Sequence, residues 1–213
     1  MTRFRERQTF LRQLLPTARK IQVARSVLSS RALLDSDSIL VIGAGDDPYR
    51  PVARRAQLYV RVDIDYAPGK SDVLADGIAL PFGGSSFHSV ISTEVLEYVC
   101  DAQRFVDEIY RVLRPGGNAI VTVPFLFNFH NDYWRPTKRA LEQLFRAYSS
   151  VSICAQGNRL LTIWDLITTT RWPRPVLMPL RVFSNVLYMV PARVICGEHG
   201  SSAPTGFFVT ATK

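Results

Sequence analysis

An aliphatic run, Ile39–Ile42, leads directly into Gly43-Ala44-Gly45, then into two acids and a proline. A continuous apolar run of this kind is typical of a strand that is buried on both faces of a parallel sheet. Asp46 or Asp47 can cap a following helix, and Pro48 fits its first turn. The segment therefore predicts a strand, a glycine turn and a helix N-terminus, which is where α/β sheets bind small ligands.

Apolar and polar positions alternate along the rest of the chain with the two periods of helices and strands. Helices are expected at about 9–34 with a break at Pro16, at 48–56, 101–114 and 137–148, and as a broken pair at 158–191. Strands are expected at 36–42, 58–63, 72–76, 88–92, 119–123, 151–155 and 206–212. This alternation predicts a doubly wound, Rossmann-like α/β domain with a mostly parallel sheet.

Length and composition fit one globular domain. The chain has 213 residues, of which 47% are hydrophobic and 21% charged. We expect a basic helical extension at 1–36, followed by the main domain at 37–213 with a helical insertion at about 157–192. The three cysteines form no close pair, the first residues lack the apolar core of a secretory signal, and the apolar run 182–192 is too short to span a bilayer. These features predict a cytoplasmic protein with reduced thiols.

The net charge of +8 is unevenly distributed. Residues 1–34 have eight basic side chains against one acidic, a net charge of +7. Residues 35–134 have eight basic and fourteen acidic side chains, a net charge of −6, and residues 135–213 have ten and three, again +7. Basic flanks of this kind suit contact with an anionic membrane surface, a phosphorylated substrate or nucleic acid, and ordinary solvated charge is the plain alternative.

The end of the second expected strand carries an acid of interest. Asp63 lies 20 residues after Gly43, where such folds present a carboxylate to ribose hydroxyls, and Asp65 is a close rival. A dinucleotide fingerprint would need a third glycine where Pro48 stands, and two carboxylates in the turn would repel a pyrophosphate. A nucleoside ligand without phosphate, such as S-adenosylmethionine, is therefore favoured.

Four segments in order carry a family resemblance: ILVIGAGDD, VRVDID, DVLADGIALPF and VISTEVLEYV…EIYRVLRPGGNAIVTVPF. Over residues 38–124 the chain resembles the class I S-adenosylmethionine-dependent methyltransferases, in particular the small-molecule and glycan group whose signature reads LPF…LEH…RVLxPGG. The resemblance implies an antiparallel last strand, S-adenosylmethionine as cofactor, and methyl transfer to an oxygen or nitrogen of a small molecule or glycan. It also implies a role for each matching residue. It places Gly43, Ala44 and Gly45 behind the methionine part, Asp63 at the ribose, Ile64 against the adenine, Asp76 with Gly77 at the adenine amino group, and Thr93 with Glu94 beneath the sulfonium.

Three positions depart from the family pattern. Val41 stands where the family often has an acid, Asp47 replaces a frequent third glycine, and Tyr98 replaces the histidine of LEH. These departures support an alternative in which the chain is a non-catalytic binding or scaffold protein on the same fold. A nucleotide-dependent oxidoreductase is a third hypothesis.

The loop after the fifth expected strand is the candidate acceptor pocket, because it combines aromatic side chains with a few polar groups. His130 is the candidate general base, since the pKa of a free histidine lies near neutrality, and Asp132 and Tyr133 are its candidate partners. The alternative is a packing cluster in which Asp132 pairs with Arg135. No histidine and cysteine spacing suggests a metal site, and nucleic acid is disfavoured because Ser92-Thr93-Glu94-Val95 lacks the motif of base-methylating enzymes. Aromatic and basic residues near the C-terminus suit a membrane interface, a lid or a dimer face.

Overall fold

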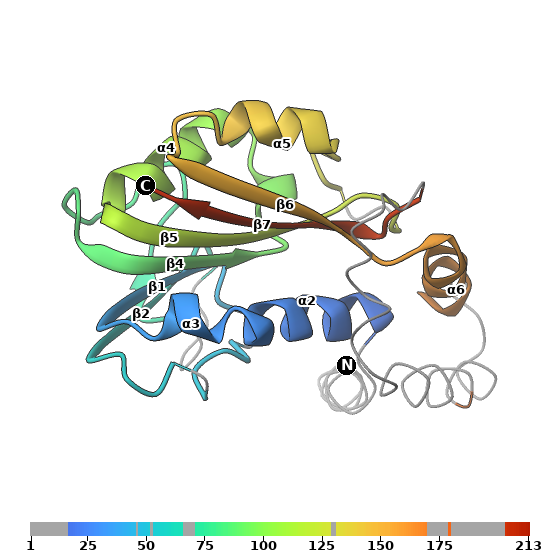
Figure 1. The fold of residues 1–213 in the computed structure, drawn as a ribbon, viewed down its shortest axis with the longest axis horizontal. Coiled ribbons are helices and arrows are strands. Elements are labelled where there is room, and N and C mark those ends of the chain that lie inside the picture. The colour runs from blue at the N-terminus through green and yellow to red at the C-terminus, as the bar shows by residue number, and fades with distance from the viewer. Residues whose placement is uncertain are drawn as a thin grey trace.

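The computed structural model describes residues 17–45, 47–51, 53–65, 71–128, 131–169, 179 and 203–213. Its centre is a seven-stranded sheet in the order β3-β2-β1-β4-β5-β7-β6 (Figure 1). The strands are β1 Ser38–Ile42, β2 Leu58–Asp63, β3 Val73–Leu74, β4 Phe87–Thr93, β5 Leu113–Pro124, β6 Ser150–Gln156 and β7 Gly206–Thr212. β1 to β5 pair in parallel, whereas β7 runs antiparallel between β5 and β6. The predicted doubly wound fold with an antiparallel last strand is confirmed.

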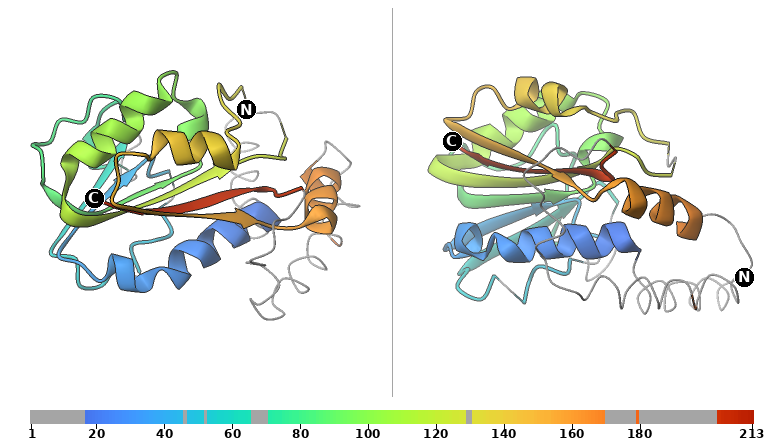
Figure 2. Two further views of the ribbon diagram at one scale, coloured as in Figure 1. Left: turned by 45° about the horizontal axis from the view of Figure 1, so that its top comes forward. Right: turned by 45° about the vertical axis from the view of Figure 1, so that its right-hand side comes forward.

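Helices cover both faces of the sheet, as Figures 1 and 2 show. On one face lie α4 (Ala102–Val112) and α5 (Lys138–Leu144), and on the other lie α2 (Ala18–Ser29) and the short α3 (Arg31–Leu34). A further helix, α6 (Arg159–Thr169), follows β6 and stands beyond the end of the strands. Side-chain caps begin three of them: Asp101 accepts from Arg104 N–H, Thr17 from Lys20 N–H, and Thr137 from Ala140 N–H.

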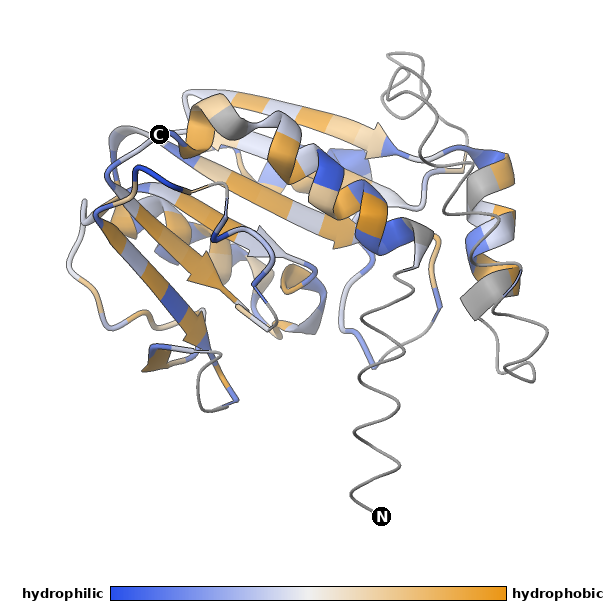
Figure 3. Ribbon diagram, turned by 90° about the horizontal axis from the view of Figure 1, so that it is seen from below, coloured by the Kyte–Doolittle hydropathy of each residue, from blue (hydrophilic) through white to orange (hydrophobic). Residues whose placement is uncertain are grey.

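Two apolar clusters hold these layers together. The larger one packs α4 and α5 on β4, β5 and β7, with Phe105, Ile109 and Phe145 fully buried. The smaller one packs α2, α3 and the segment after β1 on the other face, around Val27 and Ile39. β1 is buried on both faces, as its unbroken aliphatic run predicts, and Figure 3 shows apolar positions along the strands.

The predicted helix at 48–56 is wrong. The described residues between β1 and β2 form turns, closed by Ala53 N–H on the Tyr49 carbonyl at 3.3 Å and Ala56 N–H on the Ala53 carbonyl at 3.2 Å. Pro48 alone would fit a first turn, but Pro51 three residues later removes a backbone donor that a helix starting at Pro48 needs. The expected helix N-terminus beside the glycine turn is therefore absent from this part of the chain.

Other boundaries shift by a few residues. α4 ends at Val112, because Leu113 already has the dihedral angles of a strand, and β5 then runs through Pro115-Gly116-Gly117. The pairing of β4 with β5 shifts register between Phe87 and Ser89, so this stretch is a bulge rather than a loop. β3 has only two of the five residues expected at 72–76.

Some predictions lie outside the described residues: the part of helix 9–34 that precedes Thr17, and the second helix of the 158–191 pair. The division into an extension at 1–36 and a domain at 37–213 stays a prediction. Over the described ranges, no helix combines the length and apolar character that a bilayer crossing requires. Cys100 and Cys154 are free thiols.

Candidate functional site

A cavity of about 190 Å³ opens at the carboxyl ends of β1, β2 and β3. The carboxyl edge of a parallel sheet is where such folds bind ligands, because several strand ends converge there. The lining residues are Ile42, Gly43, Asp63, Ile64, Ala75, Asp76, Gly77, Ile78, Val95, Tyr98, Val99, Cys100, Phe105 and Tyr133. Most of the lining is apolar, and its two carboxylates come from two different strand ends.

The structure brings only part of the predicted cofactor set to this cavity. Gly43, Asp63, Ile64, Asp76 and Gly77 all line it. The remaining members do not line it and lie nearby on the same edge: Ala44, Gly45, Thr93 and Glu94. The first group lies at or just after the ends of β1, β2 and β3, and the second lies just after β1 or at the end of β4.

The glycine turn after β1 is shaped by close contacts. Gly43 has φ +69°, and a Cβ placed on it would lie 2.2 Å from Val95 Cγ2, so a side chain fits neither the backbone nor the space. The Asp63 carboxylate accepts the Gly45 N–H at 3.2 Å through Oδ2 and the Asp65 N–H at 3.2 Å through Oδ1. Asp63 thus fixes the turn and still presents acceptor lone pairs at the cavity.

The second glycine of the cavity lies after β3. A Cβ on Gly77 would lie 2.4 Å from Phe105 Cε2, so the ring of Phe105 packs directly on this backbone. Asp76 Oδ1 accepts the Ile78 N–H at 3.1 Å, which orients the carboxylate at the cavity wall. At the mouth, Ile64 and Tyr133 expose apolar surface. This pairing of apolar faces with carboxylate acceptors suits a flat, amine-bearing ring.

Two tyrosines hold the strand ends together behind the cavity. Buried Tyr49 donates its hydroxyl to Thr93 Oγ1 at 3.0 Å, and burial raises the pKa of Tyr49 to about 12. Tyr59 donates its hydroxyl to Asp47 Oδ1 at 2.8 Å, and burial together with this carboxylate raises the pKa of Tyr59. Both phenols therefore act as neutral donors at ordinary pH.

The family departures have structural explanations. Asp47 has φ +37°, a conformation that favours glycine, and its carboxylate serves Tyr59 rather than the cavity. Val41 is buried in the smaller apolar cluster. Tyr98 lines the cavity. None of the three places a charge in the cavity lining.

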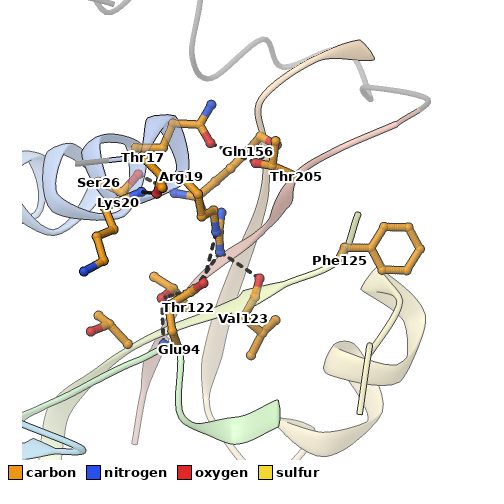
Figure 4. Close-up of polar contacts among 12 residues, drawn as sticks. Thr17, Arg19, Lys20, Ser26, Glu94, Thr122, Val123, Phe125, Gln156 and Thr205 are labelled. Carbon is orange, nitrogen blue, oxygen red and sulfur yellow. Dashed lines mark hydrogen bonds and ion pairs between the residues drawn. The ribbon is translucent and has the colours of Figure 1, made fainter. Parts of the chain in front are cut away.

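Glu94 follows β4 at φ +56° and belongs to a buried polar cluster (Figure 4). The guanidinium of Arg19, from α2, donates to Glu94 Oε1 at 2.7 Å and to Oε2 at 3.2 Å. It also donates to the Val123 carbonyl at 2.8 Å and to Gln156 Oε1. Arg19 is only 2% exposed, so one side chain ties the ends of β4, β5 and β6 to α2. The sequence pattern did not reveal it, because Arg19 falls in a basic, helical stretch that reads as solvated charge.

The acceptor loop is defined here as residues 125–135. Asp132 pairs with Arg135, which also donates to the carbonyls of Phe125 at 3.0 Å and Asn128 at 2.8 Å. Tyr133 N–H donates to the Glu97 carbonyl at 2.7 Å. His130 lies outside the described residues. Of the predicted catalytic set, Tyr133 therefore reaches the cavity and Asp132 is held in an ion pair.

Glu97 is a buried acid that sequence reasoning missed. It lies in the short 3-10 helix η1 (Leu96–Tyr98) and is 2% exposed, and within the described chain no donor reaches its Oε2. Burial, with the negative charge of Glu94, raises its pKa to about 8, while Arg19 and Arg135 partly offset this. Glu97 stands directly before Tyr98 in the Leu96-Glu97-Tyr98 segment, and a single acid there carries no periodicity signal that would mark it as buried. Where the chain is described, no His, Cys, Asp or Glu side chains gather as a metal site.

Residues 40–121 match the family described as "Methyltransferase domain". A relative from Mycolicibacterium smegmatis, named a probable S-adenosylmethionine-dependent methyltransferase, is 37% identical over 89 residues, which are 42% of this chain and 31% of that protein. A demethylmenaquinone methyltransferase of a Parafrankia species is 30% identical over 99 residues, 46% of this chain and 37% of that protein. The chain thus spans about a third of the length of these relatives.

The fold has solved counterparts. A SAM-dependent methyltransferase of Thermotoga maritima superimposes with a TM-score of 0.63 at 14% identity, covering 99% of this chain and 97% of that one. At this identity the likeness concerns the fold alone. Residues 40–121 match the methyltransferase domain, and the prediction of the class I methyltransferase fold is confirmed.

Proposed function

We propose that this protein transfers a methyl group from S-adenosylmethionine to an oxygen or nitrogen of a small-molecule or glycan acceptor. The observation that carries the proposal is the cavity at the ends of β1, β2 and β3, where Gly43, Asp63 and Asp76 converge. The domain match over 40–121 and the cofactor named for the Mycolicibacterium smegmatis relative support it.

The lining fits the cofactor's chemistry. The Asp63 carboxylate accepts from ribose hydroxyls, the Asp76 carboxylate accepts from the adenine amino group, and Ile64 covers one face of the purine. The absence of side chains at Gly43 and Gly77 lets Val95 and Phe105 pack directly on the backbone, which shapes the wall of the cavity. When bound, the cofactor supplies an electrophilic methyl group on a sulfonium.

The chain's own contribution to catalysis is then alignment, because methyl transfer is an in-line displacement. The acceptor loop lies beside the cavity and is anchored by the Asp132–Arg135 pair and by the hydrogen bonds of Tyr133 and Trp134 N–H to the Glu97 carbonyl at 2.7 and 3.3 Å. Tyr133 covers the cavity mouth and excludes water, and His130 accepts the acceptor's proton. In this proposal Asp132 stabilises the loop through its ion pair with Arg135 and takes no part in proton transfer.

We expect Asp63→Ala to weaken S-adenosylhomocysteine binding by roughly 10- to 150-fold, the scale of a lost hydrogen bond to a charged group. Asp63→Asn separates the loss of ligand contact from the loss of turn structure, because its amide oxygen can still accept from the Gly45 N–H. Asp65→Ala is the matched control, since Asp65 is exposed and absent from the cavity lining. Calorimetric titration measures all four proteins. Equal affinity in the wild type and Asp63→Ala would refute the assignment.

The acceptor step has its own test. His130→Ala should lower turnover by about 10²-fold if His130 is the base, while S-adenosylhomocysteine affinity stays nearly unchanged. Turnover is followed as S-adenosylhomocysteine formation against a panel of amines, phenols and glycans. An affinity loss as large as the rate loss would make His130 a cofactor or structural residue instead.

For the partner, we propose peripheral contact with an anionic membrane surface. The support is the charge distribution, with a net charge of +7 in residues 1–34 and again in residues 135–213. Positive segments at both ends are attracted to acidic lipids within about a Debye length.

A further inference from the structure

The helix α6 buries polar side chains and exposes aliphatic ones, the opposite of the usual arrangement. Its buried side carries Thr162 and Asp165, which are 3% and 0% exposed. Asp165 Oδ2 accepts the Arg19 backbone N–H at 3.1 Å, and Thr162 Oγ1 donates to the Ala203 carbonyl at 2.7 Å. Polar side chains thus attach α6 to α2 and to the segment before β7, where a helix of a water-soluble domain normally packs with apolar residues.

The opposite side of α6 is aliphatic. Leu160 is 77% exposed, Ile163 50% and Leu166 36%, and their spacing of three residues places them along one face. We call these three side chains the outer face of α6. Single exposed aliphatic residues need no explanation, but a row of them on one helix indicates a contact surface.

The outer face stands at the end of the molecule that holds the candidate site. α6 begins three residues after β6, whose carboxyl end is on the same edge as the cavity, and Figures 1 and 2 show it beyond the strands. The segment that Thr162 anchors also pairs with the start of the acceptor loop, since Leu126 N–H donates to the Pro204 carbonyl at 3.3 Å. A surface bound by α6 would therefore lie next to the acceptor loop.

The charge of the sequence around α6 indicates which kind of partner binds its outer face. Residues 166–197 contain four arginines and no acidic residue, and Arg159 begins the helix. Two copies of this chain would bring like charges together at a shared face, and nucleic acid would offer phosphates without an apolar phase. An anionic bilayer supplies negative charge and an apolar phase together. Aliphatic side chains can enter its interfacial region while arginines bind the headgroups.

We infer that the outer face of α6 inserts into the interfacial region of an anionic lipid bilayer. This inference rests on the proposed membrane contact and names its surface, and it is independent of methyl transfer. Its probe is the full-length protein co-sedimented with phosphatidylcholine vesicles, with and without phosphatidylglycerol. We expect wild-type protein to bind the acidic vesicles and to keep part of this binding at high salt, which basic side chains alone would not do.

Ile163→Glu should lower the partition onto acidic vesicles by about tenfold or more, because one aliphatic side chain no longer leaves water and a negative charge is added. Leu160→Glu should act in the same way at a position that contributes less to folding. The matched control is Leu58→Glu, which makes the same change at a 48% exposed residue of β2, remote from α6 in the strand order. Its partition should fall far less.

Several outcomes overturn the inference. Failure of the wild-type protein to bind acidic vesicles would overturn it. An equal loss of vesicle binding in Ile163→Glu and Leu58→Glu would also overturn it. A dimer in sedimentation that Ile163→Glu dissociates would assign the face to a second copy. Unfolding of both α6 variants would mean that the face packs inside the chain. Calorimetry with S-adenosylhomocysteine without lipid should give wild-type affinity for every variant, so a failure of the methyltransferase proposal would be seen separately.

Discussion

Arg19→Met is expected to destabilise the protein by about 3 kcal/mol, the lower end of the cost of breaking a buried ion pair, because the Glu94 side chain left behind is 29% exposed. Arg19 is 2% exposed, and its guanidinium donates hydrogen bonds to the Glu94 carboxylate, the Val123 carbonyl and the Gln156 side chain. Methionine fills much of the volume, but among the described residues it leaves the Glu94 carboxylate with Thr122 Oγ1, at 2.9 Å, as its remaining side-chain donor. The loss should therefore exceed what removal of a surface charge causes.

Urea unfolding measures this loss, and the neighbouring Lys20→Met is the matched control. Lys20 lies on the same helix but is exposed, so its replacement should change stability by less than about 0.5 kcal/mol. Glu94→Gln should also destabilise, and the double variant should cost less than the sum of the two single changes. A cost for Arg19→Met below about 1 kcal/mol would show that the ion pair does not form as described.

The strands could be predicted from the sequence because a strand buried on both faces has a continuous run of aliphatic residues, as in Ile39–Ile42. The helix α4 could be predicted because Asp101 caps it and its apolar residues repeat at helical spacing. The segment 48–56 could not, because a capping acid followed by Pro48 resembles a helix start. What prevents the helix is Pro51, together with the positive φ of Asp47.

The candidate site divides in the same way. Gly43, Asp63 and Asp76 follow strands at recognisable distances, so their meeting at one sheet edge could be predicted from topology. Val95 and Phe105 could not, because apolar residues of this kind read as ordinary core. Arg19 belongs to the site region only through tertiary packing, 75 residues away in the chain from Glu94, and no local pattern encodes that pairing.

Glu97→Gln is expected to change how stability depends on pH. Burial raises the pKa of Glu97 to about 8 in the folded protein, against the ordinary value of 4.5 for an unfolded chain. Between these values the folded state keeps the proton and the unfolded state releases it, so the stability contributed by protonated Glu97 is complete below pH 4.5. It is lost as pH rises towards 8, by about tenfold in the folding equilibrium per pH unit. Glutamine carries no such proton, so the variant should lack this loss.

Urea unfolding at several pH values tests this expectation. Wild type and Glu97→Gln should have similar stability near pH 5, and the variant should be the more stable of the two near pH 8.5. Glu142→Gln, an exposed acid on α5, should follow the wild-type curve. Glu94→Gln removes the second cause of the shift, so it should lower the pKa of Glu97 and move the upper end of the window below pH 8. Parallel curves for wild type and Glu97→Gln would mean that Glu97 is ionised in the folded protein. In that case a donor in solution must reach the Oε2 atom that now has none among the described residues.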